Sequence, residues 1–185
     1  MKANFPKLAY HYRGALVAIP LVIAIISTWH EYENEAVTWA VAGGIFIMGL
    51  ALRIWAQQHI HFRLRTEDRL TTTGPYALVR NPIYIANTLI CIALTIASEV
   101  LWMVPVTILT CIITYYFVVR FEEVKLTELY GEAYTAYLSK VPRWLPRRLS
   151  APGLYWSRKY LCVSVRVEAY NLLFIIPMIL KELLH

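Results

Sequence analysis

The sequence predicts an all-α integral membrane protein that forms a single membrane domain over residues 1–185. Of the 185 residues, 58% are hydrophobic and only 16% are charged, whereas soluble domains carry about a quarter charged residues. The apolar residues are grouped in long runs, and only Ser98-Glu99 separates two of these runs. These observations indicate four or five transmembrane helices, with a tight hairpin between the third and the fourth.

Four apolar runs are long enough to cross a bilayer, because helices of 16 to 20 residues rise about 24–30 Å. They are Gly14–Trp29, Ala36–Trp55, Ile83–Ser98 and Val100–Val119. The first run has no small-residue cleavage site after it, so we expect it to stay as an anchor. A fifth run, Ala169–Leu180, is shorter and contains Pro177. We expect it to be interfacial or partly inserted, because a span extended back to Tyr160 would bury Arg166 and Glu168.

The distribution of charge predicts the orientation of the helices. With the N-terminus inside, the outer loops hold acidic residues but no lysine or arginine, namely Glu31, Glu33, Glu35 and Glu99. All 18 basic residues then lie on the cytoplasmic side, provided that the C-terminal run does not cross, as the positive-inside rule requires. We therefore attribute the net charge of +6 to topology and to contact with anionic membrane lipids. Basic residues scattered beside membrane segments do not favour nucleic-acid binding.

Metal and disulfide chemistry have little support in the sequence. No Cys-x-x-Cys pair occurs, and the three cysteines Cys91, Cys111 and Cys162 lie in or beside apolar stretches. His59 and His61 have the i, i+2 spacing of ligands on a strand, but no third ligand is evident, so we predict no metal site. The oligomeric state is open, since Gly43, Gly44 and Gly49 form the only cluster of small residues.

A polar connection, Ala56–Asn81, is expected to join the second and third helices on the cytosolic side. Gly74-Pro75-Tyr76 is typical of a turn. Asn81-Pro82 predicts an N-cap followed by proline at the first helical position. That helix start would place free N–H groups and the positive end of the helix dipole near Arg80 and Tyr84, where a carboxylate could dock. Alternatively, the pair only starts a helix, and Arg80 and Tyr84 anchor it at the membrane interface.

A second polar group, Arg120-Phe-Glu122-Glu123, follows the fourth apolar run. Adjacent glutamates point about 100° apart on a helix, so one is expected to face a pocket while the other pairs with Lys125 or Arg120. A hydrated charge cluster is the alternative. The apolar spacing over residues 125–138 predicts an amphipathic cytosolic helix that serves as a lid or as a peripheral anchor, and two prolines end it.

Five motifs in order resemble a known superfamily. They are Leu70-x₃-Gly-Pro-Tyr76, Val79-Arg-Asn-Pro-Ile-Tyr84, Arg120-x-Glu-Glu123, Tyr130-Gly-Glu-Ala-Tyr-x-x-Tyr137 and Val141-Pro-Arg-Trp-Leu-Pro146. Together they resemble the membrane-embedded methyltransferases that include isoprenylcysteine carboxyl methyltransferase and phospholipid N-methyltransferase. The resemblance covers about Glu67 to Pro146, which is somewhat under half of the chain.

The resemblance implies S-adenosylmethionine as cofactor, held by an Arg-x-Pro-x-Tyr-x-Gly motif and a glutamate pair. The cofactor-binding residues that it implies here are Tyr76, Arg80, Asn81, Pro82, Tyr84, Ala86, Glu122 and Glu123. Two of these depart from the family pattern, because Asn81 replaces a histidine and Ala86 replaces the glycine. Within the single membrane domain we expect a cofactor-binding catalytic core over residues 57–150, between an N-terminal helix pair (1–56) and an interfacial or partly inserted C-terminal segment (151–185).

We therefore predict an S-adenosylmethionine-dependent methyltransferase that acts on a lipophilic or lipid-anchored acceptor at the membrane–cytosol interface. The cofactor activates its own methyl group, so the protein mainly aligns a nucleophile and excludes water. Arg120 and Glu123 are the candidate catalytic residues, Arg120 to orient an anionic acceptor and Glu123, or Glu122, to take a proton. The acceptor, whether a prenylcysteine, a phospholipid amine or a small thiol, is open. Two alternative functions also stay open, namely an NADPH-dependent reductase of the sterol reductase type and a non-catalytic ligand-binding protein.

Overall fold

The computed structural model describes residues 5–27, 35–66, 70–147, 157–172, 176, 179 and 180. Every regular element within these residues is a helix. The elements are α1 (Phe5–Ile26), α2 (Glu35–Thr66), α3 (Pro75–Leu78), α4 (Pro82–Ala97), α5 (Met103–Tyr130), α6 (Glu132–Lys140) and α7 (Arg158–Leu172). The prediction of an all-α protein is confirmed for this part of the chain.

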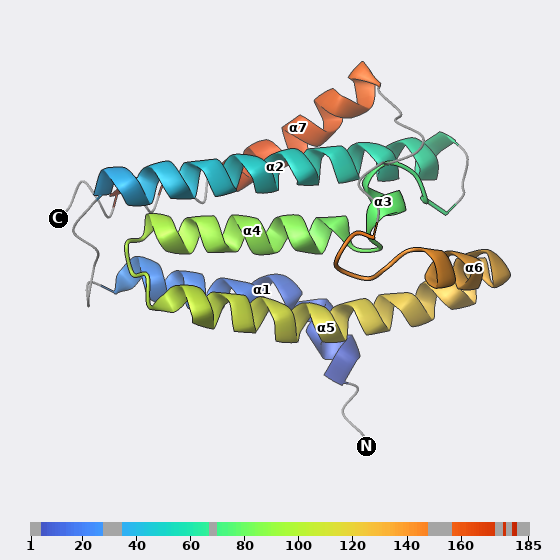
Figure 1. The fold of residues 1–185 in the computed structure, drawn as a ribbon, viewed down its shortest axis with the longest axis horizontal. Helices are drawn as coiled ribbons and strands as arrows, with labels where there is room; N and C mark the ends of the chain where they lie inside the picture. Colours follow the sequence, from blue (N-terminus) through green and yellow to red (C-terminus); the bar gives the residue numbers. More distant parts are fainter. Residues whose placement is uncertain are drawn as a thin grey trace.

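The long helices lie side by side along one axis, with α4 between α2 and α5 (Figure 1). Helix α1 packs mainly against α5, and α7 packs against the outer side of α2. The short helices α3 and α6 lie together at one end of this bundle (Figure 1). That end also holds the start of α4 and the end of α5 (Figure 1), so residues far apart in the sequence meet there.

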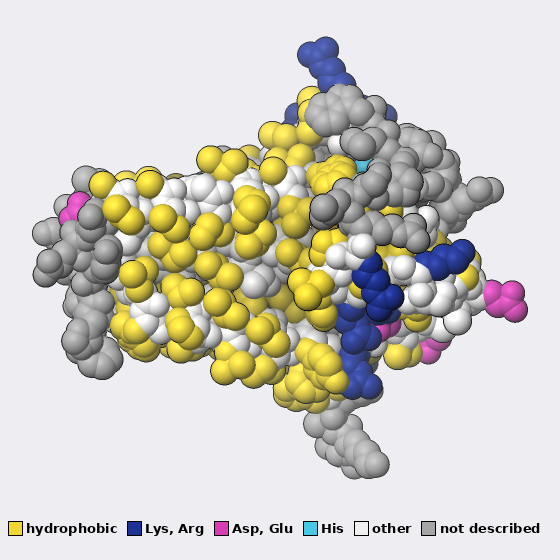
Figure 2. Space-filling model, viewed as in Figure 1, with side chains coloured by type: hydrophobic (Ala, Val, Ile, Leu, Met, Phe, Trp, Pro, Cys, Tyr) yellow, Lys and Arg dark blue, Asp and Glu magenta, His cyan; other side chains and the backbone are white. Residues whose placement is uncertain are grey.

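In the part of the chain that the structure describes, three helices are long and apolar enough to cross a membrane, namely α1, the Glu35–Ile60 part of α2, and α5. Helix α4 is also apolar, but its 16 residues give a length of about 24 Å. Figure 2 shows apolar side chains over most of the visible helical body, while charged side chains gather mainly at the end where α3 and α6 lie. Large apolar side chains such as Ile47 of α2 and Ile112 of α5 are exposed on these helices.

Helix α2 is longer than the apolar run predicted, because it continues from Trp55 to Thr66. The first part of the expected connection, from Ala56 to Thr66, is therefore helical. Polar side chains at the start of this extension have hydrogen-bond partners on α7 and on the residue that precedes it. Gln57 donates a short hydrogen bond to Glu168 of α7, and Gln58 donates to the Ser157 carbonyl at 3.1 Å. The apolar run marks the part of the helix suited to hydrocarbon, not the end of the helix.

The connection between α4 and α5 is short, and the two helices pack against each other. Ser98 ends α4, Glu99 has a positive φ of 66°, and α5 begins at Met103, slightly later than the predicted Val100. Thr38 of α2 donates a 3.1 Å hydrogen bond to the Glu99 carboxylate, which holds the turn against the start of α2.

The predicted C-terminal run Ala169–Leu180 lies partly outside the described residues. Helix α7 precedes and overlaps it, and packs on α2 through the buried Ser164 and Glu168. Glu168 forms an ion pair of 2.8 Å with Arg53, while Arg166 is exposed. A carboxylate can be buried in this position because an arginine on the facing helix neutralises it.

Candidate functional site

The loop between α2 and α4 shapes one wall of the candidate site. Gly74 adopts φ 59° and ψ −133° and precedes α3, so the predicted turn at Gly74-Pro75-Tyr76 is in fact the start of a short helix. A Cβ atom on Gly74 would lie 2.3 Å from the imidazole ring of His59, which is buried in α2. Glycine is therefore required here both by the backbone and by the close approach of the histidine.

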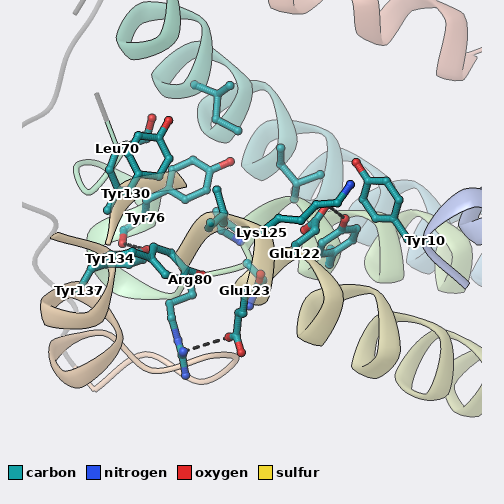
Figure 3. Close-up of a pocket in the computed structure, with 17 residues that line it drawn as sticks. Tyr10, Leu70, Tyr76, Arg80, Glu122, Glu123, Lys125, Tyr130, Tyr134 and Tyr137 are labelled. Carbon is teal, nitrogen blue, oxygen red and sulfur yellow. Dashed lines mark hydrogen bonds and ion pairs between the residues drawn. The ribbon is translucent and has the colours of Figure 1, made fainter. Parts of the chain in front are cut away.

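A cavity of about 350 Å³ opens at this end of the bundle (Figure 3). Residues from α1 to α6 contribute to its wall. They are Tyr10, Ile60, Leu70, Thr71, Tyr76, Arg80, Asn81, Pro82, Ile83, Tyr84, Glu122, Glu123, Lys125, Leu126, Tyr130, Tyr134 and Tyr137. The cavity thus brings together two carboxylates, two cations and several tyrosines, and its volume is within the range of small-molecule sites.

Glu122 reaches the cavity from α5 and is bound by Tyr84 of α4. The Tyr84 hydroxyl donates a 2.7 Å hydrogen bond to Oε1 of Glu122. The Tyr84 ring is buried and packs on the Tyr115 ring at a centroid distance of 4.7 Å, which fixes its direction. Within the described residues, Oε2 of Glu122 accepts no hydrogen bond. One carboxylate oxygen is therefore oriented, and the other is open to a ligand.

Glu123 has a different environment, because two arginines occupy both of its oxygens. Arg80 Nη1 lies 3.0 Å from Oε1, and Arg143 binds with two nitrogens, Nε to Oε1 at 3.0 Å and Nη2 to Oε2 at 2.6 Å. The hydrogen bond to Glu123 also raises the pKa of Arg143 above its ordinary value. The prediction that the adjacent glutamates face different partners is confirmed, but the partners of Glu123 are Arg80 and Arg143, not Lys125 or Arg120.

Residues 141–147 are hydrogen-bonded to the residues at the start of α4. The Arg80 amide donates to the Pro142 carbonyl at 2.9 Å, and the Asn81 side-chain amide donates to the Arg143 carbonyl at 3.2 Å. Asn81 does occupy the N-cap position of α4, but its side chain makes no capping hydrogen bond. The predicted cap is wrong in this respect, because the amide is turned toward the Arg143 carbonyl.

Helix α6 folds back over the cavity. Gly131 has φ 54° and ends α5, so the predicted amphipathic run over residues 125–138 is broken there into two helices. Tyr134 and Tyr137 of α6 are buried, and the Tyr137 hydroxyl donates to the Tyr76 carbonyl at 2.7 Å. Burial raises the pKa of Tyr134 to about 12, so this phenol keeps its proton at neutral pH.

Two polar atoms in the cavity wall are buried and have no hydrogen-bond partner among the described residues. They are the Tyr76 hydroxyl and the Arg80 Nε group. Burial raises the pKa of Tyr76 well above its ordinary value, so the hydroxyl remains a neutral donor. Buried polar groups are normally hydrogen-bonded. Both groups are therefore suited to bind a ligand with acceptor oxygens.

Two residues predicted for the site do not line this cavity. Arg120 is exposed, and its Nη1 donates to the Tyr116 hydroxyl at 2.8 Å. It lines a more open depression together with Glu123 and Arg143. Ala86 is fully buried and faces Gly49 of α2, since a Cβ atom on Gly49 would lie 3.1 Å from the Ala86 carbonyl oxygen. The backbone of Ala86 therefore lies close to α2, at the contact between α2 and α4.

His59, which has the i, i+2 spacing of a metal ligand with His61, is buried in α2. Its Nδ1 lies 3.3 Å from the Thr73 hydroxyl in the interior, and its ring contacts Gly74. The His61 side chain lies outside the described residues. Among the residues that are described, no group of three or more metal-ligating side chains occurs.

Sequence reasoning missed several cavity residues. Arg143 lies in one of the five motifs, but nothing in that motif indicates that its guanidinium binds Glu123. The repeated tyrosines of α6 suggested only an amphipathic helix. Tyr10 reaches the cavity from α1, and no sequence signal connects this helix with the site.

The residues that the structure describes form a helical bundle with three helices able to cross a membrane and a polar cavity at one end. The phospholipid methyltransferase family model matches residues 37–133. The chain belongs to this family. The match includes α4, α5, Tyr84 and the glutamate pair, whereas α1 and α7 lie outside it.

Two curated proteins are similar to this chain. The nickel-cobalt-cadmium resistance protein NccN of Alcaligenes xylosoxydans xylosoxydans is 27% identical over an alignment of 137 residues, and this alignment covers 71% of this chain and 62% of NccN. The cobalt-zinc-cadmium resistance protein CzcN of Cupriavidus metallidurans is 32% identical over an alignment of 135 residues, and this alignment covers 71% of this chain and 61% of CzcN. The alignments thus span about three fifths of these relatives. No solved structure matches the chain.

Proposed function

We propose that this protein transfers a methyl group from S-adenosylmethionine to a lipophilic or lipid-anchored acceptor at the membrane–cytosol interface. The observation that carries the proposal is the cavity in which Glu122, with one oxygen oriented by Tyr84, lies beside the Arg80–Glu123 ion pair. Membership of the phospholipid methyltransferase family supports methyl transfer at a membrane. The cytoplasmic placement of the cavity rests on the distribution of basic residues.

The residues of the cavity fit the donor. Its carboxylate would accept hydrogen bonds from the Tyr76 hydroxyl and the Arg80 Nε group, the two buried donors that lack partners among the described residues. Its ribose hydroxyls or ammonium group would bind Glu122, and its adenine would pack on the tyrosines of α6. When bound, S-adenosylmethionine supplies a methyl group that its sulfonium already activates.

The two glutamates are suited to different tasks. Glu123 is held by three hydrogen bonds from Arg80 and Arg143, so it fixes the start of α4 against residues 141–147. Glu122 keeps one oxygen available, so it is the better acceptor for a proton lost by an amine or thiol nucleophile. We therefore assign proton transfer to Glu122 and positioning to Glu123. Helix α6 would exclude water from the cavity.

Titration calorimetry on the purified protein in detergent tests the donor. We expect heat from S-adenosylmethionine and from its demethylated product, and about tenfold weaker binding to the Glu122→Gln variant. The matched control is Glu128→Gln, an exposed glutamate on the same helix. Heat from NADPH instead would support the reductase alternative, and heat from neither ligand would support a non-catalytic role.

A labelled-methyl assay then tests the acceptor. The purified protein is incubated with methyl-labelled donor and total lipid extract, and label is expected in the organic phase. The names of the two relatives concern metal resistance, so extracts from cells grown with cobalt or cadmium salts are included. Glu122→Gln should reduce incorporation more than Glu128→Gln. Donor binding without labelling of lipid or thiol would contradict this part of the proposal.

A further inference from the structure

Two cysteines face each other between α4 and α5, outside the cavity. The two helices are antiparallel (Figure 1), and the hydroxyls of Thr95 and Thr107 meet between them at 3.0 Å. One helical turn closer to the cavity, these helices carry Cys91 and Cys111 at the corresponding positions. The register that joins the two threonines therefore also brings the two sulfur atoms together.

The contacts of the two cysteines agree with this register. Both are free thiols, and each lies within hydrogen-bonding reach of the other. Cys111 is fully buried in the apolar cluster that also contains Tyr84 and Tyr115. Cys91 packs against the same cluster and keeps part of its surface exposed. The two sulfurs are therefore placed to bind one atom between them.

Two facing thiols between apolar helices favour one class of ion. Thiolates are soft ligands and select soft metals. Structural zinc takes four ligands, but the described part of the chain contains no group of three or more metal-ligating side chains. A divalent ion that accepts two sulfurs in a line, such as Hg²⁺, forms a neutral complex with two thiolates and leaves no net charge buried in hydrocarbon. A monovalent ion such as Cu⁺ would leave a negative charge there.

We propose that Cys91 and Cys111 form a binding site for a soft divalent cation that is coordinated by two sulfurs, with Hg²⁺ as the probe. When mercuric chloride reacts with both thiols, two Hg–S bonds form, and two protons and two chloride ions leave. The exposed part of Cys91 offers the entering salt its first sulfur. The sequence indicated no metal site, because only the register of α4 and α5 brings these cysteines together. The site lies outside the cavity, so it does not depend on methyl transfer.

Retention of the metal against a competing monothiol tests the pair. The purified protein in detergent is loaded with mercuric chloride and then titrated with glutathione. Because two thiols of one chain hold the ion together, Cys91→Ala and Cys111→Ala should each release it at glutathione concentrations about a hundredfold lower than the parent protein. Cys162→Ala removes the exposed thiol of α7, and this matched control should retain the metal as the parent does.

Two further measurements on Cys162→Ala keep the test independent of whether the Cys91 and Cys111 variants fold. Loading in a weak buffer should release about two protons for each bound metal, since both ligands must be deprotonated. The loaded protein should also unfold at a higher temperature than the metal-free protein, because the ion binds the folded state. Release of one proton per metal, or an unchanged unfolding temperature, would contradict binding between the two sulfurs.

The choice of ion is tested by loading the protein with Zn²⁺ or Cu⁺ in place of Hg²⁺. We expect glutathione to remove both of these ions at concentrations at which Hg²⁺ stays bound. Equal retention of Zn²⁺ or Cu⁺ would overturn the assignment to a divalent ion with two ligands. Retention of Hg²⁺ by folded Cys91→Ala and Cys111→Ala, or its loss from Cys162→Ala, would overturn the site itself.

Discussion

Tyr84 and Glu122, 38 residues apart in the sequence, are joined by a 2.7 Å hydrogen bond between the phenol and Oε1 of the carboxylate. The bond connects the start of α4 with the end of α5. Because Tyr84 is buried and packs on Tyr115, the phenol has little freedom to turn away. The orientation of the Glu122 carboxylate in the cavity thus depends on one hydroxyl group.

Removing that hydroxyl should impair methyl transfer without unfolding the protein. In Tyr84→Phe the ring still packs on Tyr115, but Glu122 loses a charge-assisted hydrogen bond worth about 1.5–3 kcal/mol. We expect kcat/KM for labelled-methyl transfer to fall about tenfold or more. Tyr116→Phe removes another hydroxyl, which accepts a hydrogen bond from Arg120 away from the cavity, and serves as the control. Equal activity of the two variants would contradict a role for Tyr84.

The contact between Arg143 and Glu123 should hold residues 141–147 against α4. Arg143→Lys keeps the charge but cannot reproduce the two-nitrogen contact. We expect faster hydrogen exchange of the Arg80 amide, which bonds to the Pro142 carbonyl, and about tenfold weaker donor binding. Arg147→Lys, at an exposed position of the same segment, should change neither.

A double-mutant cycle distinguishes a specific pair from general loosening. Arg143→Gln and Glu123→Gln should each weaken donor binding, while the double variant should lose less than the sum of the two effects in free energy. Strictly additive losses would show that the two residues act separately, and that Glu123 does not position this segment through Arg143.

Much of the fold could be predicted because it depends on local pattern. The apolar runs indicate α1, α2, α4 and α5, and Asn81-Pro82 and Ser98-Glu99 mark ends of α4. The length of α2 could not be predicted, since its polar extension is ordered by partners on α7 such as Glu168. The break at Gly131 depends on where α6 packs, and a single glycine within a helical pattern does not reveal that.

The candidate site could be predicted in part. Motif order indicated that Tyr84, Arg80 and the glutamate pair act together, and the structure brings them to one cavity. It could not indicate that Arg120 points away, because a one-residue difference in position on a helix turns a side chain by about 100°. The contribution of Tyr10 depends on long-range packing of α1 on α5, and no motif in the sequence of either helix indicates that packing.

Gly74 should not tolerate a side chain. Alanine at this position would have to adopt φ 59° and ψ −133° and would place its Cβ 2.3 Å from the buried His59 ring. We expect Gly74→Ala to lower the free energy of unfolding by about 2–5 kcal/mol, from backbone strain and overpacking together. Thermal unfolding in detergent measures the loss.

Gly131→Ala separates the two contributions. Gly131 has a similar backbone conformation, but no atom lies within 4 Å of a Cβ placed there. Gly131→Ala should therefore lower the free energy of unfolding by only about 1–3 kcal/mol, from backbone strain alone. A Gly74→Ala loss no greater than that of Gly131→Ala would show that the His59 ring moves aside at little cost.

The ion pair between Arg53 and Glu168 should hold α7 on α2. Glu168 is 2% exposed, and Arg53 also forms a short hydrogen bond with Asn87 of α4, so one arginine links three helices. Glu168→Ala leaves the arginine without its buried counter-charge, a change that costs about 3–5 kcal/mol when both groups are fully buried. Arg53 is partly exposed at 22%, so water can replace part of the interaction. We expect a loss of about 2–3 kcal/mol in thermal unfolding.

Limited proteolysis shows whether that loss is local to α7. Protease should cut α7 faster in Glu168→Ala than in the parent protein. Glu168→Gln keeps an acceptor for Arg53, so its cleavage rate should lie between the other two rates. Arg166→Ala removes an exposed charge from the same helix and should behave like the parent. If Arg166→Ala and Glu168→Ala are cut at the same rate, the buried pair does not hold α7. Because α7 lies outside the family match, donor binding should survive Glu168→Ala even where the helix is released.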